Sequence, residues 1–120
     1  GLIDVARARG RADPHARAQL GALHAAAWGL SAILEQAGRE IDRDPDDDAN
    51  AAHARALAAR HLVERLCTDV LDRFGRATGP APLAFDAEVA RRHAELALYI
   101  RQCHGERDLE SLVDAAEEAR

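Results

Sequence analysis

The sequence predicts an all-α protein, an antiparallel up-down four-helix bundle, and three observations lead to that prediction. Its 120 residues include 28 alanines and only 4 prolines, a composition that favours helix over strand. Leucines and alanines recur at steps of 3 and 4, the period of an amphipathic helix. Aromatic residues make up only 3%, so we expect a core of Leu, Ala, Val and Ile. A chain of this length should form one domain, 1–120.

The longest predicted helix, from Pro14 to about Asp42, organises the bundle. Asp13 is a good N-cap, and Pro14 suits the first helical position because its missing N–H would have no partner there. An apolar seam follows and should face the other helices: Leu20, Leu23, Ala27, Leu30, Leu34, Ala37 and Ile41. Trp28 lies off this seam beside His24 and gives the helix a second apolar face. We therefore expect other helices to contact it on two sides.

Turn signals divide the chain into five predicted helices, at about 2–10, 14–42, 47–78 and 87–104, with a short closing helix at 107–117. The aspartates of the loop Asp44–Asp48 suit the positive N-terminal end of the third helix, and Gly79 can end that helix in a left-handed conformation. An apolar connector follows, and we expect Leu83 and Phe85 to hold it against the bundle. Asp86 is a suitable N-cap for the fourth helix.

Charge and hydropathy exclude two classes of partner. The net charge is −5 and the sequence pI is near 5.6, which argues against nucleic acid. The longest apolar run, Gly21–Leu34, contains His24 and is too short to span a membrane. Cys67 and Cys103 lie far apart in helical patterns and are expected to be reduced thiols of a cytoplasmic protein.

The sequence carries no motif of a metal site or of common catalytic chemistry. Carboxylate di-iron bundles use Glu-x-x-His pairs, whereas His61 and Glu64 offer only the reverse order, once. Zinc bound by Cys67, Cys103 and two histidines would lack the usual paired-ligand spacing. Gly-x-Ser-x-Gly, phosphate-loop and dinucleotide-binding motifs are absent from the sequence. We therefore expect no metal, and the catalytic residues stay unknown.

Polar residues concentrate at the end of the fourth predicted helix: Arg101, Gln102, His104, Glu106, Arg107 and Asp108. Two explanations compete. Arg and His suit the negative C-terminal pole of a helix, so the cluster could be a cap with surface ion pairs, which is the simpler explanation. Alternatively, the cluster faces a ligand. Positions 101 and 104 share one helical face, but 102 lies about 100° from 101, so a common site requires the helix end to unwind.

The order of the elements and two short segments carry a family resemblance. A long helix ends in Gly75-Arg-Ala-Thr-Gly79-Pro, a short apolar connector follows, and a last long helix closes the bundle. The chain then reads Tyr99-Ile-Arg-Gln-Cys-His-Gly-Glu-Arg-Asp-Leu109. Over about Leu20–Leu112, this arrangement resembles the C-terminal helical domain of acyl-CoA dehydrogenases, and the second segment is similar to the C-terminal part of a bacterial branch of that family.

This resemblance implies an oxidoreductase, a flavoprotein in which FAD and acyl-CoA bind between this bundle and two further domains. Family members remove a proton and a hydride from adjacent carbons of the acyl-CoA, and they are homo-oligomers, dimers or tetramers, built through this bundle. Arg101, Gln102 and His104 are then expected to bind the cofactor by donating to its negative charge. The Glu-Gly-Thr signature that carries the base in many members is absent, so no base is assigned. Alone, the segment should hold no FAD and be inactive.

The alternative is a stand-alone helical module for protein interaction or oligomerisation, without flavin. Leu2, Ile3 and Val5 open the chain in mid-pattern without a cap, which we expect of a segment of a longer protein rather than of a self-contained module. Both functions predict self-association, through the Trp28 side of 14–42 or the Ala-rich first half of 47–78.

Overall fold

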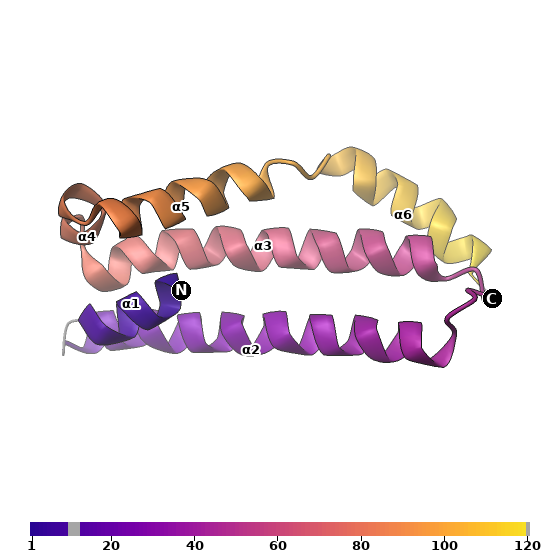
Figure 1. The fold of residues 1–120 in the computed structure, drawn as a ribbon, viewed down its shortest axis with the longest axis horizontal. Helices are drawn as coiled ribbons and strands as arrows, with labels where there is room; N and C mark the ends of the chain where they lie inside the picture. The colour runs from indigo at the N-terminus through magenta and orange to yellow at the C-terminus, as the bar shows by residue number, and fades with distance from the viewer. Residues whose placement is uncertain (10–12, 120) are drawn as a thin grey trace.

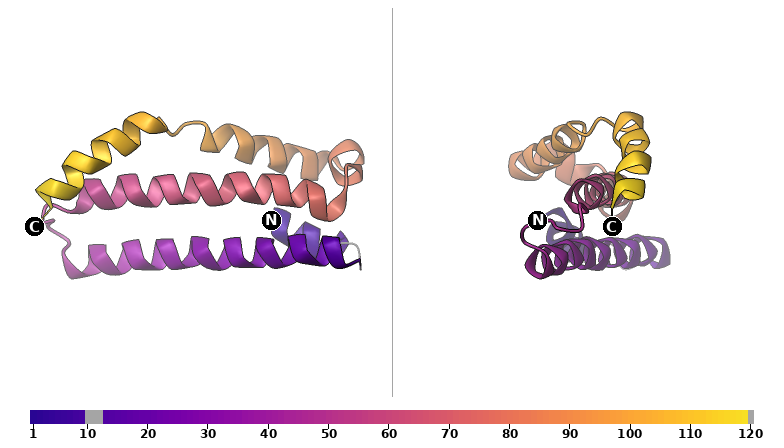
Figure 2. Two further views of the ribbon diagram at one scale, coloured as in Figure 1. Left: turned by 180° about the vertical axis from the view of Figure 1, so that it is seen from behind. Right: turned by 90° about the vertical axis from the view of Figure 1, so that its right-hand side faces the viewer.

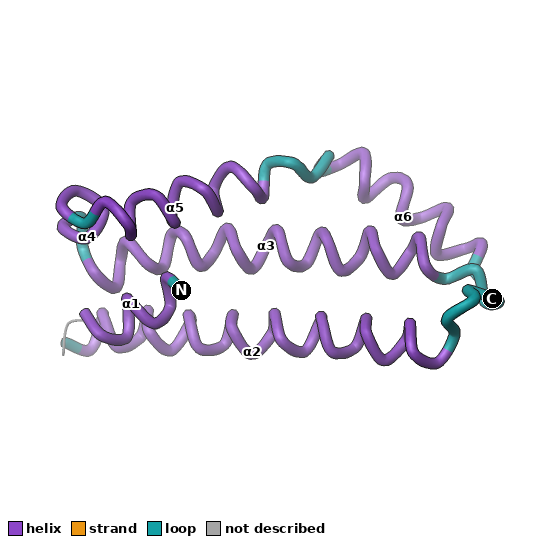
Figure 3. Tube along the Cα trace, viewed as in Figure 1, coloured by secondary structure: helices purple, strands orange, loops and turns teal. Residues whose placement is uncertain are grey.

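The computed structural model describes residues 1–9 and 13–119, and every regular element in this part of the chain is a helix (Figures 1 and 3). The all-α prediction is therefore confirmed. Position 10, the predicted end of the first helix, lies outside the described residues. None of the helices described has the length and apolar character needed to cross a membrane. The helices are α1 Leu2–Arg9, α2 Pro14–Arg43, α3 Ala52–Thr78, α4 Ala81–Phe85, α5 Ala87–Ile100 and α6 Glu106–Glu118.

Helices α2 and α3 form a long antiparallel hairpin on which the other helices pack, giving a rod of 50 × 24 × 22 Å (Figures 1 and 2). After the reversal at α4, α5 and then α6 run back along α3. Helix α1 contacts α2, α3 and α5, and it covers only the end of the rod at which α2 begins. Four helices therefore surround the core at that end.

The caps of α2 and of the loop after it come from aspartates. Asp13 accepts hydrogen bonds from the N–H groups of His15 and Ala16, at 3.1 and 3.0 Å, so its predicted N-cap role is confirmed. Asp44 follows α2, and its two carboxylate oxygens accept from the N–H groups of Asp48 and Ala49, at 2.9 and 3.0 Å. These bonds replace helical hydrogen bonds and hold the loop in a compact turn.

The start of α3 differs from the prediction. The helix begins at Ala52, five residues after the predicted start near Asp47. Asp47 and Asn50 adopt left-handed backbone conformations, with φ of 56° and 53°, which a right-handed helix cannot include. Asp47 instead accepts 2.8 Å hydrogen bonds from the N–H groups of Ala51 and Ala52. The acidic loop thus caps α3 from outside the helix.

The core lies at the four-helix end and includes Leu2, Ala6, Leu23, Ala26, Val70, Phe74, Ala77 and Val89. Leu23 of the predicted seam is fully buried there. Two other seam residues, Leu34 and Ile41, are 63% and 51% exposed, so the prediction that they face other helices is wrong. They lie on the part of α2 beyond α1. Trp28 is 77% exposed, and the contact predicted on its side of α2 is not made within the chain.

The connector after α3 is the short helix α4 rather than an extended segment. Gly79 ends α3 as predicted and has a positive φ of 71°, but its ψ of −175° lies outside the left-handed helical region. The N–H groups of Leu83 and Ala84 donate to the carbonyl of Pro80. Leu83 packs against the core, but Phe85 is 89% exposed, so its predicted role in pinning the connector is wrong. The turn of α4 that buries Pro82 points Phe85 outward.

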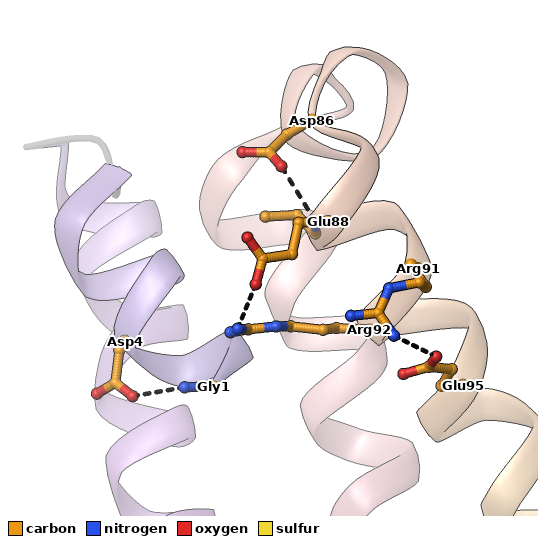
Figure 4. Close-up of polar contacts among 8 residues, drawn as sticks. Gly1, Asp4, Asp86, Glu88, Arg91, Arg92 and Glu95 are labelled. Atoms are coloured by element: carbon orange, nitrogen blue, oxygen red, sulfur yellow. Dashed lines mark hydrogen bonds and ion pairs between the residues drawn. The ribbon is translucent and has the colours of Figure 1, made fainter.

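The start of α5 is held as the sequence predicts. The carboxylate of Asp86 accepts a 3.2 Å hydrogen bond from the N–H of Val89 (Figure 4). Along the exposed face of α5, Arg92 pairs with Glu88 one turn before it, and the next pair along joins Arg91 to Glu95 at 2.7 Å. Pairs at this spacing and exposure contribute only a few tenths of a kcal/mol each.

Candidate binding site at the junction of α5 and α6

The junction between α5 and α6, residues 101–105, is not helical, although the sequence predicts a helix to about 104. Ile100, the last residue of α5, is buried. The N–H groups of Arg101 and Gln102 donate to carbonyls three residues back, at 3.2 and 3.1 Å, which tightens the last turn. Gly105 then takes a φ of 57°, which glycine adopts without strain. The helix end therefore unwinds within the predicted polar cluster.

Arg60 of α3 ties this junction to the long hairpin. Its guanidinium donates a 2.8 Å hydrogen bond to the carbonyl of Gln102 and lies 3.9 Å from the Asp108 carboxylate. Asp108, the third residue of α6, also accepts from the N–H of His104 at 3.1 Å, so its side chain reaches back over the start of the helix much as the acid of a capping box does. A hydrogen bond to Cys103, with the added charge of Asp108, raises the pKa of Arg60 above its ordinary value. Arg60 is thus a fixed cation at the centre of the junction.

Two hollows flank the junction and share the side chains of Glu64, Ile100 and Cys103. The first, of about 260 Å³, has a lining that is about half polar, and α3, the junction and the start of α6 form its walls. The second, of about 370 Å³, is mainly apolar and includes Leu34 and Tyr99. A single ligand could present a charged group to the first hollow and an apolar part to the second.

The predicted site residues are distributed around the junction rather than gathered on one face. Arg101 lines the first hollow and Gln102 lines the second. His104 lines neither of these two hollows, and its side chain is exposed. The unwound junction, which a common site requires, is present. It brings Arg101 and Gln102 to the two sides of one turn.

Two residues of α3, Arg60 and Arg65, join this site although the sequence analysis did not select them. Arg60 is 42 residues from Gln102, so no local pattern connects them. Arg65 lines the first hollow together with Arg101, and within residues 1–9 and 13–119 neither of these two arginines forms an ion pair. Guanidinium groups without a carboxylate partner are suited to binding phosphate or carboxylate groups.

Acidic side chains also line the first hollow and limit what it can bind. Glu64 already accepts a 3.0 Å hydrogen bond from Thr68, and Asp108 is engaged by Arg60, so two of the acids have partners. Glu106, in the first turn of α6, adds a third negative charge. The hollow therefore suits a ligand that offers an anionic group to the arginines and hydrogen-bond donors to the acids.

Metal ligands and thiols do not form a further centre in the part of the chain that the structure describes. No three His, Cys, Asp or Glu side chains come together there as a metal site requires, although His61 and Glu64 share the first hollow. Cys67 and Cys103 are both free thiols and half-buried. Burial, with a smaller contribution from Glu64, raises the pKa of the Cys67 thiol, which makes it a weaker nucleophile at neutral pH.

Comparison with known proteins adds no assignment, because no family model, no curated protein and no solved structure matches the chain.

Proposed function

We propose that this chain is the C-terminal helical bundle of an acyl-CoA dehydrogenase-like flavoprotein. In that enzyme it would line the FAD and acyl-CoA site and mediate oligomerisation, and alone it would be inactive. The observation that carries the proposal is at the junction. Tyr99–Leu109, the segment with the most specific resemblance, is where the helix is interrupted and where a hollow with arginine and acidic side chains lies beside a mainly apolar one.

The arrangement of the helices supports an up-down four-helix bundle of the kind found in that family. Helix α1 contacts α2, α3 and α5, and consecutive long helices alternate in direction (Figure 1). A short α4 stands between α3 and α5, at the place of the apolar segment that precedes the last helix in the family.

The donors at the junction fit an anionic cofactor such as FAD. Arg101, with Arg65 beside the same hollow, would neutralise a phosphate group, while Gln102 and His104 would donate hydrogen bonds from the exposed turn. FAD, when bound, supplies the acceptor for the substrate hydride. Within the described part of the chain we assign no catalytic base, and the base would come from elsewhere in the enzyme.

The test uses the full-length protein that contains this segment. Arg101→Ala and His104→Ala should lower bound flavin, read by absorbance, and turnover of acyl-CoA substrates. Arg91→Ala is the matched control, because Arg91 is equally a surface arginine of this region but pairs with Glu95 on the outer face of α5. If both variants keep the flavin content and turnover of the wild-type protein, the polar cluster acts only as a helix cap and does not bind the cofactor.

A stand-alone interaction module is the second candidate, and one surface favours it. Leu62 is 47% exposed and lines a shallow apolar hollow of about 340 Å³ between α2 and α3. Trp28, four residues before Ala32 of the same hollow, is 77% exposed. Among its walls are Ala32, Ile33, Ala37, Ala58, Ala59 and Leu62. Small side chains let a second helix approach closely, so this face suits a second copy of the chain.

Self-association is expected under both proposals, as a dimer or tetramer. Sedimentation equilibrium of the chain should show an oligomer that Trp28→Ser or Leu62→Ser weakens. Leu98→Ser is the control, since Leu98 is 72% exposed on α5, away from this face. A monomer at high protein concentration would contradict the oligomer. Oligomer formation with no flavin in the full-length protein would favour the interaction module.

A further inference from the structure

Helix α1 occupies one end of a groove that is longer than the helix itself. Its Leu2 and Ala6 are buried, and Ile3 and Val5 pack against the core. The walls of the groove are α2, α3 and α5, all of which α1 contacts. The fold thus already holds one amphipathic helix in this groove, antiparallel to α2 (Figure 1).

The groove continues past the N-terminal end of α1, where Gly1 and Leu2 line a hollow. This end of α1 lies nearer to the end of the rod at which α2 begins than to the opposite end (Figure 1). The hollow next to α1, here called the α1 hollow, has a volume of about 430 Å³. Beyond it lies the mainly apolar hollow of the α5–α6 junction, of about 370 Å³. On each of the three wall helices, the residue that lines the junction hollow lies about one turn farther from α1 than the residue that lines the α1 hollow. The corresponding pairs of residues are Leu30 and Leu34, Cys67 and Val63, and Leu96 and Ile100.

The floor of this continuation is apolar and uncovered. Leu34 is 63% exposed and Tyr99 is 65% exposed, and both line the hollow farther from α1. Ile41, further along α2, lines neither hollow and is 51% exposed. Leu34 and Ile41 belong to the same seam of α2 as Leu23, which is fully buried. The sequence therefore carries an uninterrupted apolar seam along α2, although α1 covers only its first part.

We propose that this groove is the seat of an amphipathic α-helix, laid end to end with α1 and carrying aliphatic side chains at steps of 3 and 4. The seam from Leu30 to Ile41 corresponds to roughly 16 Å, or about three helical turns. The continuity of the groove with the established α1 interface argues for a helix in the α1 direction.

The rims of the groove indicate that apolar fit, rather than charge, selects the occupant. Arg92, which lines the α1 hollow, pairs with Glu88 (Figure 4). Arg60, which lines the mainly apolar hollow of the junction, pairs with Asp108. These charges already have partners within the chain. The inference does not rest on flavin binding. The helix would fill the mainly apolar hollow that Gln102 lines, so it and a ligand group in that hollow would exclude each other, while Arg101 beside the other hollow of the junction stays accessible.

A helical extension of about twelve residues joined to Gly1 tests the proposal, since attachment gives the probe a high effective concentration. One version carries leucines at the positions that continue the α1 stripe, and the other carries serines there. The leucine version should raise the thermal midpoint by at least about 4 °C over the serine version. It should also slow hydrogen exchange around Leu34 and Tyr99.

Two variants locate the effect. Leu34→Asp should remove the gain, while Trp28→Ser, at a residue that lines neither hollow of the groove, should keep it. Because Leu34 is 63% exposed, the unextended Leu34→Asp chain should remain folded, which circular dichroism checks. Equal midpoints for the leucine and serine versions, or a gain that survives Leu34→Asp, would overturn the proposal. So would an oligomer of the unextended chain that Leu34→Asp dissociates, because a second copy would then occupy the groove.

Discussion

Gly29 of α2 lies directly against Leu66 of α3, so that a Cβ atom added at Gly29 would come within 3.3 Å of Leu66 Cδ1. That separation is tighter than an ordinary van der Waals contact. The end of a leucine side chain can shift by a few tenths of an ångström, whereas the two long helices cannot separate without disturbing the core. The size of the residue at position 29 therefore limits how closely α2 and α3 approach.

Substitutions at Gly29 should depend on size. Gly29→Ala is expected to be nearly neutral, because a helix-propensity gain of about 1 kcal/mol is offset by the displacement of Leu66. Gly29→Leu should cost about 1–3 kcal/mol through overpacking. Gly38→Ala, in the same helix with nothing within 4 Å of the added atom, is the control and should gain about 0.5–1 kcal/mol. Urea unfolding measures all three, and wild-type stability for Gly29→Leu would contradict the close contact.

The position of the core predicts unequal effects of truncation along the rod. Phe74 is fully buried, so Phe74→Ala should lower the free energy of unfolding by about 3–5 kcal/mol. Leu34 is 63% exposed, so Leu34→Ala should change it by less than about 0.5 kcal/mol. Thermal and denaturant unfolding would compare the two. Similar losses for both would mean that the core extends along the whole of α2.

Asp44 should make the acidic loop sensitive to low pH. Hydrogen bonds from the N–H groups of Ala49 and Asp48 hold the pKa of its carboxyl below the ordinary value in the folded state. A lowered folded-state pKa contributes stability above the unfolded-state pKa, and that stability is lost as the pH falls through the folded-state pKa. Asp44→Ala should therefore lower the midpoint of urea unfolding at pH 7, and it should change that midpoint much less at a pH below the folded-state pKa of Asp44. An equal loss at both pH values would exclude this role of the carboxylate.

Arg60 should control the order of the α5–α6 junction. Arg60→Ala removes the hydrogen bond to the Gln102 carbonyl and the ion pair to Asp108, so amide exchange over 101–110 should quicken by roughly tenfold. Arg60→Lys should restore little, because one ammonium lacks the planar fork of the guanidinium. Arg65→Ala, which removes an arginine without an ion pair from the same helix, should leave exchange unchanged. Unchanged exchange in Arg60→Ala would show that other contacts hold the junction.

The sequence predicts most of this fold because its caps and periods are local. Asp13, Asp86 and Gly79 act where the pattern places them. The wrong predictions concern features that depend on contacts between residues far apart in the sequence. The seam period cannot show that α1 leaves Leu34 and Ile41 uncovered, and the acidic loop gives no sign that Asp47 adopts a left-handed conformation. At the site, the sequence predicts Arg101 and Gln102. It does not predict Arg60, because only the packing of α3 brings Arg60 to the junction.

The most direct test of the proposed function is the flavin content of the full-length protein that contains this segment. The protein should be purified without added cofactor, and flavin should be measured by absorbance and, after denaturation, identified by chromatography. The proposal predicts close to one FAD per chain, which acyl-CoA substrate bleaches under anaerobic conditions. A folded full-length protein that carries no flavin, and whose thermal midpoint does not rise when FAD is added, would contradict it.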